Sequence, residues 1–384
     1  MNRLGEIAEV CVGQAAPQEP GSFGTSGFPF IRAGSLERLC AGAPLRGLEQ
    51  ISSDVAKKYR LRLFPANTIL FAKSGMSATL GRIYKMAGPA YVVSHLAAII
   101  PKYDIDSGYL VHFFVKNPPS SLIANEAYPS IRLSEIEDLN IPLPSIEEQR
   151  RIAAILDKAE SISIKRQKTI QLAGDLVKSQ FIEMFGTWDE LDKWPCKIID
   201  DIADVTVGVV IKPAQYYTEL PDGIRAFRSL NVGEMYVRDG DWVYFTSEGN
   251  KVNKKSELKE GDVLVVRSGY PGTSCVVTSD YAGSNAIDII IARPDTTVIN
   301  SIYLCAFTNF SHGKNQIKKK IGGAAQQHLN IGAYRDVTIA LPPLSLQNQF
   351  AAFVKQADKS KFSMKKSLDD IEMMYKSLAQ EYFG

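Results

Sequence analysis

The chain repeats itself once, and this duplication limits the folds available to it more than any other feature. Residues 143–160, LPSIEEQRRIAAILDKAE, match residues 341–358, LPPLSLQNQFAAFVKQAD, and KSQFIEMFG at 178–186 matches KSLAQEYFG at 376–384. Both pairs lie 198 positions apart, so the two stretches align without a gap. Such a long period is unlike a solenoid repeat. It predicts a duplicated unit made of one globular domain and one helix.

The globular halves repeat as well. LGEIAEVCVG at 4–13 resembles IDDIADVTVG at 199–208, FIRAGSL at 30–36 resembles AFRSLNV at 226–232, and ILFAKSG at 69–75 resembles VLVVRSG at 263–269. This alignment places Arg32 on Arg228, Lys73 on Arg267, and Ser74 on Ser268. AGPAYVVSHLAAII resembles YAGSNAIDIII, and that match places Ser94 on Ser284.

Periodicity indicates the elements of each unit. Short β-rich runs at 68–71, 91–93 and 97–100 are separated by Gly, Pro and Ser, and short helical segments are expected at 109–115 and 303–310. After Pro144 and Pro343 the pattern becomes helical for about 40 residues, up to Gly186 and Gly384. Pro before a helix and Gly just after it are typical of helix ends.

Each long helix carries an apolar stripe in steps of three and four residues. In the first helix its members are Ile152, Ile155, Ala159, Ile162, then, after an interruption at Arg166, Ile170, Ala173, Val177, Phe181 and Met184. In the second they are Phe350, Phe353, Ala357, Ser360, Met364, Leu368, Ile371, Tyr375, Leu378 and Tyr382. A helix of this length spans about 60 Å at ~1.5 Å per residue, too long to bury its stripe against one small domain. We therefore expect the helices to pair as an antiparallel coiled coil, since residues 187–197 must turn the chain back. The alternative is that each helix packs only on its own domain.

The expected fold class is α+β, with two similar mixed α/β domains at residues 1–142 and 199–340. Long helices follow at 143–186 and 341–384, and residues 187–198 form a linker.

Composition is that of a globular chain, with 45% hydrophobic residues, and the longest uncharged stretches are too polar to span a bilayer. The N-terminus has no apolar signal region, so a cytoplasmic protein without a membrane partner is expected. The cysteines are scattered and form no CxxC pair, which argues against disulfides and a zinc site. Because the net charge is only +2, any surface for DNA must be local.

Polar chemistry suited to DNA gathers late in each half. The segment KNQIKKKIGGAAQQHLN at 314–330 contains lysines for phosphate contacts and amides that can bind adenine edges. Its counterpart, NEAYPSIRL at 125–133, has Arg132 where Asn330 stands, and Arg prefers guanine. KKYRLR at 57–62 and KVNKK at 251–255 add basic runs. Each run alone is more often a solvated face, but recurrence in both halves favours contact.

Catalytic motifs are weak. NPPS at 117–120 resembles an amino-methyltransferase signature, but Ser120 replaces the aromatic residue and the second half reads NFSHG. There is no P-loop, and Glu257 and Lys259 form an ExK pattern that occurs often by chance. The sequence therefore predicts a chain that is not an enzyme.

Two domains that each precede LP-x-x-x-x-Q and a long helix resemble the specificity subunit of type I restriction-modification systems. The resemblance rests on the segments starting at 143 and 341, on ILFAKSG and VLVVRSG, and on GGAAQQHLNIGAYRDVTIALPPL. The second copy departs in having Leu346 and Asn348 around Gln347, where an acidic residue before Gln is usual.

The resemblance implies two target-recognition domains that each read half of a split site on double-stranded DNA. It also implies a coiled coil that sets the gap, two methylation subunits that modify adenine, and restriction subunits. S-adenosylmethionine, ATP and Mg are then expected only in those partner subunits, with no cofactor or metal in this chain. The candidate DNA contacts are Arg32, Lys73, Ser74, Ser94, Arg132, Arg228, Arg267, Ser268, Lys318, Lys319, Lys320, Gln326, Gln327, His328 and Asn330.

Three other functions remain open on the sequence. They are the recognition subunit of a type II enzyme with a bipartite site, a DNA methyltransferase, and a coiled-coil adaptor that does not bind DNA. If the helices set the gap, inserting four residues after Ala173 should change it, whereas exchanging residues 1–142 should change one half-site.

Overall fold

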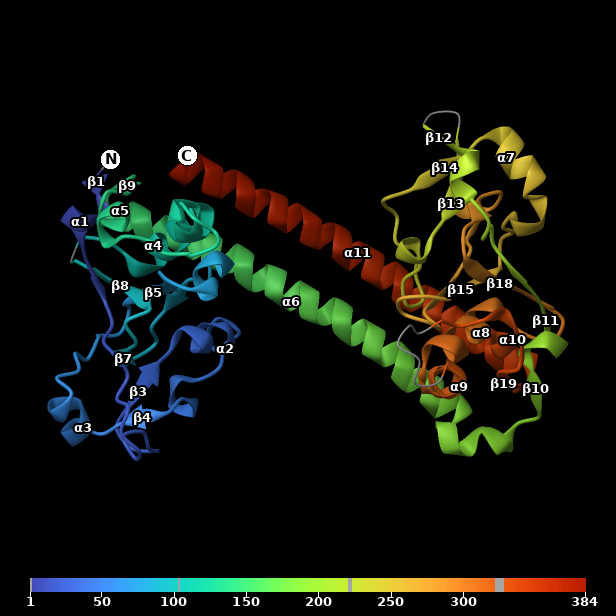
Figure 1. Cartoon of the computed structure of the whole chain (residues 1–384), viewed down its shortest axis with the longest axis horizontal. Coiled ribbons are helices and arrows are strands. Elements are labelled where there is room, and N and C mark those ends of the chain that lie inside the picture. Colours follow the sequence, from blue (N-terminus) through green and yellow to red (C-terminus); the bar gives the residue numbers. More distant parts are fainter. Residues whose placement is uncertain (1, 103, 220–222, 322–327) are drawn as a thin grey trace. The chain divides into compact units, whose positions relative to one another are not determined.

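The computed structural model describes residues 2–102, 104–219, 223–321 and 328–384, apart from the side chains of residues 191 and 192. The chain divides into two units. The first consists of residues 1–167 and 365–384, and the second of residues 168–364. Both ends of the chain therefore belong to the first unit, where β1 and the end of α11 are seen in Figure 1.

The first unit contains a four-stranded antiparallel sheet in the order β2-β8-β5-β6 and a three-stranded sheet in the order β4-β3-β7, in which β3 and β7 run parallel. Two terminal strands, β1 and β9, pair with each other. The strands are β1 Asn2–Arg3, β2 Ala8–Val12, β3 Phe28–Ile31, β4 Gln50–Ile51, β5 Ile69–Ala72, β6 Tyr84–Lys85, β7 Tyr91–Val92, β8 Leu96–Pro101 and β9 Asn140–Ile141. The short helices are α1 Leu4–Ile7, α2 Leu36–Cys40, α3 Ser53–Lys58, α4 Ser107–Lys116 and α5 Leu133–Glu137.

The second unit repeats this plan. Its antiparallel sheet has the order β11-β18-β15-β16, its second sheet has the order β12-β14-β13-β17 with β13 and β17 parallel, and β10 pairs with β19. The strands are β10 Cys196–Ile198, β11 Ala203–Val207, β12 Tyr217–Thr218, β13 Ile224–Phe227, β14 Val243–Phe245, β15 Val263–Val266, β16 Ser274–Val276, β17 Asn285–Ala286, β18 Ile289–Pro294 and β19 Thr338–Ala340. The short helices are α7 Ser247–Val252, α8 Ser301–Asn309, α9 Ser311–Ile321 and α10 Ile331–Arg335.

The central strands are buried on both faces, which explains their continuous apolar sequences. In β5, Ile69 and Phe71 join one hydrophobic cluster, while Leu70 and Ala72 join another on the opposite face. In β15, residues 263 and 265 face one cluster and residues 264 and 266 face another. This alternation follows from the two-residue period of a strand. It confirms the β-rich runs expected from the sequence.

The long helices are α6 Ile146–Phe185 and α11 Leu344–Phe383. Gly186 and Gly384, directly after them, have φ of +91° and +88°. This left-handed conformation is favourable for glycine, so both residues stop their helices as expected.

In each unit, one end of α6 and the opposite end of α11 pack into the same hydrophobic cluster, so the two long helices run antiparallel. In the first unit, Ile152 and Leu156 near the start of α6 share a cluster with Ala379 and Phe383 near the end of α11. In the second unit, residues 177, 181 and 185 near the end of α6 share a cluster with residues 350 and 354 near the start of α11. The alternative in which each helix packs only on its own domain is therefore wrong.

The glutamine of the LP-x-x-x-x-Q motif connects each long helix to its domain. The buried Gln149 donates to the carbonyls of Asp104 and Pro144 at 3.2 and 2.9 Å and accepts from the backbone N–H of Asp106 at 2.9 Å. Gln347 is equally buried and accepts from the backbone N–H of Asn300 at 2.9 Å. A buried amide that satisfies backbone groups in this way fixes the position of the helix start.

Strand pairing corrects one part of the repeat alignment. Phe30 pairs with Tyr91 in the first unit, and its counterpart Ala226 pairs with Asn285 in the second. Tyr91 thus corresponds to Asn285, and Ser284 corresponds to Ala90. The match of Ser94 with Ser284 is wrong, because the first unit has an additional residue between its β7 and β8 strands.

Candidate nucleic-acid interface

In the first domain, the candidate site forms where two distant segments cross. The chain leaving β5 at Lys73 runs beside the segment that returns to α5. The N–H of Ile131 donates to the carbonyl of Lys73 at 2.8 Å, and the N–H of Gly75 donates to that of Pro129 at 2.9 Å. At this crossing the Oγ of Ser74 lies 2.9 Å from Nδ1 of His95.

The second domain builds the same crossing. Ser268, directly after β15, pairs with His328 as an isolated bridge, and the N–H of Leu329 donates to the carbonyl of Arg267 at 2.8 Å. The Oγ of Ser268 lies 2.7 Å from Nδ1 of His328. The structure therefore brings Arg267, Ser268 and His328 together, three residues that the sequence placed in two separate segments.

Arg267 is the centre of the second cluster. Its guanidinium forms an ion pair with Asp288, and it lies 2.9 Å from Nε2 of His328 and 3.3 Å from the carbonyl of Leu329. Only 13% of its side chain is exposed. These contacts make Arg267 a residue that holds the crossing together.

The histidines of the two clusters come from different backbone positions. In the first domain His95 lies between β7 and β8, where the second domain has Asp288 between β17 and β18. In the second domain His328 occupies the bridge position that Ser130 occupies in the first. A Ser–His pair is thus formed in both domains by different routes.

Arg32 and Arg228 occupy equivalent places directly after β3 and β13. The guanidinium of Arg32 lies 4.7 Å from the centre of the Phe23 ring, and it pairs with Glu49 at 3.2 Å. Arg228 donates to the carbonyl of Asp241, and its buried Nε finds no hydrogen-bond partner in the part of the chain that is described. These contacts hold both side chains at the surface. Both arginines lie far in sequence from the Ser–His pairs at the crossings.

The other candidate residues are distributed around the second segments. The three lysines of α9, Lys318, Lys319 and Lys320, are exposed on its last turn, and Nζ of Lys319 lies 5.7 Å from the centre of the Trp188 ring. Asn330 caps α10, because its Oδ1 accepts from the N–H of Ala333 at 2.8 Å. Arg132 is exposed at the start of α5. Gln326 and Gln327 lie outside the described residues, and Ser94 donates its backbone N–H to the carbonyl of Gln14 at 3.0 Å.

Sequence reasoning missed His95, Asp288 and the large side chains beside the crossings. Tyr128 and Tyr270 are 82% and 80% exposed, and Met76 is 69% exposed. Correct placement of the gap between residues 93 and 96 would have aligned His95 with Asp288. Exposed aromatic side chains beside polar groups are typical of binding surfaces.

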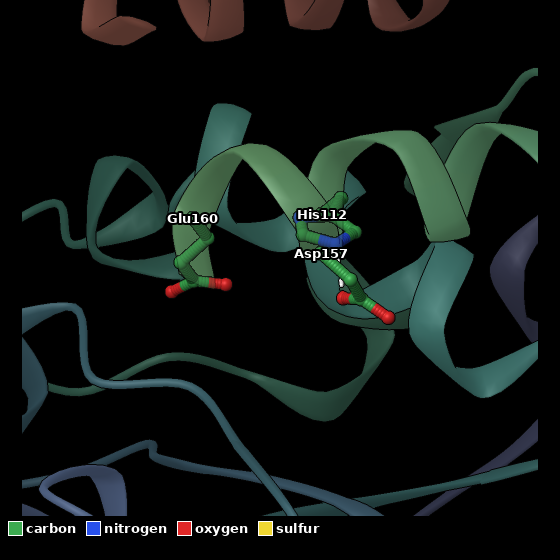
Figure 2. Close-up of side chains that lie close together, drawn as sticks. All are labelled: His112, Asp157 and Glu160. Atoms are coloured by element: carbon green, nitrogen blue, oxygen red, sulfur yellow. Dashed lines mark hydrogen bonds and ion pairs between the residues drawn. The ribbon is translucent and has the colours of Figure 1, made fainter. Parts of the chain in front are cut away.

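A separate cluster joins His112, Asp157 and Glu160, whose potential ligand atoms lie within 4.8 Å of one another. Figure 2 shows Asp157 and Glu160 on α6 beside the imidazole of His112. Nε2 of His112 lies 2.7 Å from Asp157, and Nδ1 lies 2.9 Å from the hydroxyl of Tyr375 on α11. Since the carboxylate can only accept, Nε2–H donates to it and Nδ1 accepts from the tyrosine.

Both ring nitrogens of His112 are thus engaged, and the residue ties α4, α6 and α11 together. Tyr109 and Tyr303 bond to equivalent carbonyls, those of Pro142 and Ala340, so the position of His112 corresponds to the buried Ala306. The side-chain hydrogen bonds of His112 are therefore specific to the first unit, because alanine at the equivalent position cannot form them. Burial raises the pKa of Tyr375 to about 12, which keeps its hydroxyl protonated as a donor.

The NPPS segment does not present its asparagine as a methyltransferase would. Asn117 ends α4, and its side-chain amide donates back to the carbonyl of Phe113 at 3.4 Å.

In the part of the chain that is described, no helix is long and apolar enough to cross a membrane.

Comparison with known proteins defines the class. A family profile described as "Type I restriction modification DNA specificity domain" matches residues 1–173 and 229–373. The chain therefore belongs to this family of DNA specificity domains.

Individual relatives agree along most of the chain. The chain is 23% identical to the type I restriction enzyme MjaIX specificity subunit of Methanocaldococcus jannaschii, over 92% of this chain and 85% of that protein. It is 22% identical to the StySPI specificity subunit of Salmonella potsdam, over 92% and 80%. The crystal structure of an S subunit from M. genitalium has the same fold, with a TM-score of 0.62, 14% identity and coverage of 100% of this chain and 95% of that one.

Proposed function

We propose that this chain is the sequence-specific DNA-binding subunit of a type I restriction-modification complex. Each domain reads one half of a bipartite site on double-stranded DNA, and the long helices connect the two readers. The chain positions two adenine-methylating subunits and restriction subunits on that DNA. Its place of action on this proposal is the cytoplasm.

The observation that carries the proposal is the duplication of the crossing. Two domains whose antiparallel sheets have the same strand order each present a Ser–His pair, at 2.9 and 2.7 Å, beside a largely exposed tyrosine. Equivalent surfaces with different side chains suit the reading of two different half-sites. Base edges in the major groove are distinguished by hydrogen bonds of this kind.

Phosphate contacts are assigned to basic side chains that remain exposed. The three lysines of α9 lie on one exposed turn, and Arg132 is exposed at the matching segment of the first domain. Such contacts strengthen binding to every sequence and make it sensitive to salt. Buried or fully paired residues such as Arg267 are given no such role.

Catalysis is assigned to the partner subunits. S-adenosylmethionine, ATP and Mg are bound there on this proposal, and the isolated chain transfers no methyl group and cuts no DNA. The NPPS segment is consistent with this assignment, because the side-chain amide of Asn117 donates back to the carbonyl of Phe113 in its own helix.

The test is to produce the chain with methylation subunits from the same genome and to map methylated adenines by single-molecule sequencing. One bipartite motif with a fixed gap is expected, and exchange of residues 1–142 for a relative's domain should change one half-site only. A motif that is not split, or methyl transfer by the isolated chain free of other subunits, would contradict the proposal.

A further inference from the structure

The Ser–His pairs at the two crossings lie at the surface in both domains. His95 and His328 are exposed, and Ser74 and Ser268 are partly exposed, so neither pair fills a core. The crossings are already held by backbone hydrogen bonds, on both sides of Ser74 and between Leu329 and Arg267 beside Ser268. A polar pair that recurs at one surface position, although its histidine comes from different segments, points to a ligand.

In the second domain the hydrogen-bond directions are determined. A guanidinium can only donate, so Nε2 of His328 accepts from Arg267. A neutral imidazole then carries its proton on Nδ1, which donates to Oγ of Ser268. Within residues 2–321 and 328–384, as far as they are described, no acceptor takes the hydroxyl hydrogen of Ser268, which is consequently left to donate to a ligand.

Asp288 completes this arrangement. Its carboxylate pairs with Arg267 and holds the guanidinium against His328. Arg267 is mostly covered and already has three partners, so it acts through His328 and Ser268 and is a positioning residue. The second crossing therefore presents a fixed hydrogen-bond donor.

The first domain differs at the same place. No arginine approaches Nε2 of His95, for which the described residues offer no hydrogen-bond partner. Ser74 and His95 are therefore able to exchange donor and acceptor roles with each other. The Ser74–His95 pair can therefore present either a hydrogen-bond donor or an acceptor to a ligand, whereas Ser268 presents a donor.

We propose that the hydroxyl of Ser268 donates to a base-edge acceptor of DNA, such as guanine O6 or N7 or thymine O4, in the half-site read by the second domain. The Ser74–His95 pair reads the equivalent position in the other half-site. Arg267, His328 and Asp288 hold the donor in place. This inference rests on the proposed function and assigns a chemistry to one position of each half-site.

The test uses the complete complex of this chain with its methylation subunits and a DNA library randomised at every position of both half-sites. Ser268→Ala is expected to relax the base preference at one position of one half-site by roughly fivefold, the size of one hydrogen bond. The other half-site should be unchanged. Ser268→Thr keeps the hydroxyl and should keep the preference.

Variants of Ser74 and Arg267 distinguish a side chain that contacts a base from one that only positions the contacting side chain. Ser74→Ala is the matched control and should relax one position of the opposite half-site. Arg267→Gln should relax the same position as Ser268→Ala without altering the salt dependence of binding, and Arg267→Lys should restore part of the preference. If Arg267→Gln instead weakens all sequences equally and lowers the slope of log K against log salt by about 0.9, Arg267 contacts phosphate and its positioning role is wrong.

An unchanged preference in a folded Ser268→Ala complex, or equal relaxation in both half-sites, overturns the inference. Thermal unfolding of each variant checks that the domain is intact. If the wild-type complex recognises no bipartite motif, the proposed function itself fails, and this result is distinct from a wild-type motif that Ser268→Ala leaves unchanged.

Discussion

Lengthening both long helices by the same amount is expected to widen the gap between the half-sites without changing either half-site sequence. Four residues inserted after Gln167 in α6 and four after Met364 in α11 fall at the boundary between the two units, so the contacts inside each unit are kept. Four residues add ~6 Å of helix at ~1.5 Å per residue. At ~3.4 Å per base pair this corresponds to about two base pairs.

The structure shows why the insertion must be matched. Phe383 and Ala379 of α11 are buried with Ile152 of α6, and Tyr375 bonds to His112. Four residues added after Ala173 would lengthen α6 alone by about one turn, and α11 would then be too short to keep all of these contacts. That single insertion is therefore expected to lower the stability of the first unit instead of shifting the gap cleanly.

The assay is single-molecule sequencing of DNA methylated by the complex that contains each variant. A matched seven-residue insertion provides a second point, because a heptad keeps the apolar seam in phase and adds ~10.5 Å, about three base pairs. A matched variant that is folded and active but keeps the original spacing would refute the idea that the helices set the gap.

Three further predictions follow from individual side chains. Changing the three lysines of α9 to Ala should weaken binding to all DNA sequences alike and lower the salt slope by about 0.9 for each lost phosphate contact, whereas an unchanged slope would mean a solvated face. His112→Ala should destabilise the first unit by about 2–4 kcal/mol in denaturant unfolding, because it leaves a cavity and removes the partner of Tyr375; a loss below about 0.5 kcal/mol would contradict the tie. His312 is buried at the start of α9, and this burial lowers the pKa of its imidazole below the usual 6.5. The folded state therefore favours the neutral imidazole, so the free energy of unfolding is highest above pH 6.5 and decreases as the pH falls. His312→Gln should therefore lose less thermal stability than the wild type on acidification from about pH 7.5 to 5.5, and equal losses would refute this assignment.

Much of the fold could be predicted because it depends on local patterns and on the repeat. The two long helices begin after Pro144 and Pro343 and end at Gly186 and Gly384, as these residue types indicate. The central strands were visible as apolar runs. The role of Gln149 was not, because its partners at residues 104 and 106 lie far from it in sequence.

The candidate site was less accessible to sequence reasoning. Ser268 and His328 could each be selected for their chemistry, but their contact depends on how two distant segments cross. His95 was missed because a one-residue difference between the domains hides its correspondence with Asp288, and only strand pairing places that gap.

The burial of α11 against the first domain has a consequence for synthesis. Ala379 and Phe383 belong to the same core as Leu4, so the domain that is translated first receives its last core residues only after the second domain has been made. Until then the apolar face around Ile152 is open on the ribosome, and exposed surfaces of this kind invite association. A chain that ends before α11 is complete leaves this apolar face uncovered, so premature termination should lower the stability of the first unit and promote its aggregation.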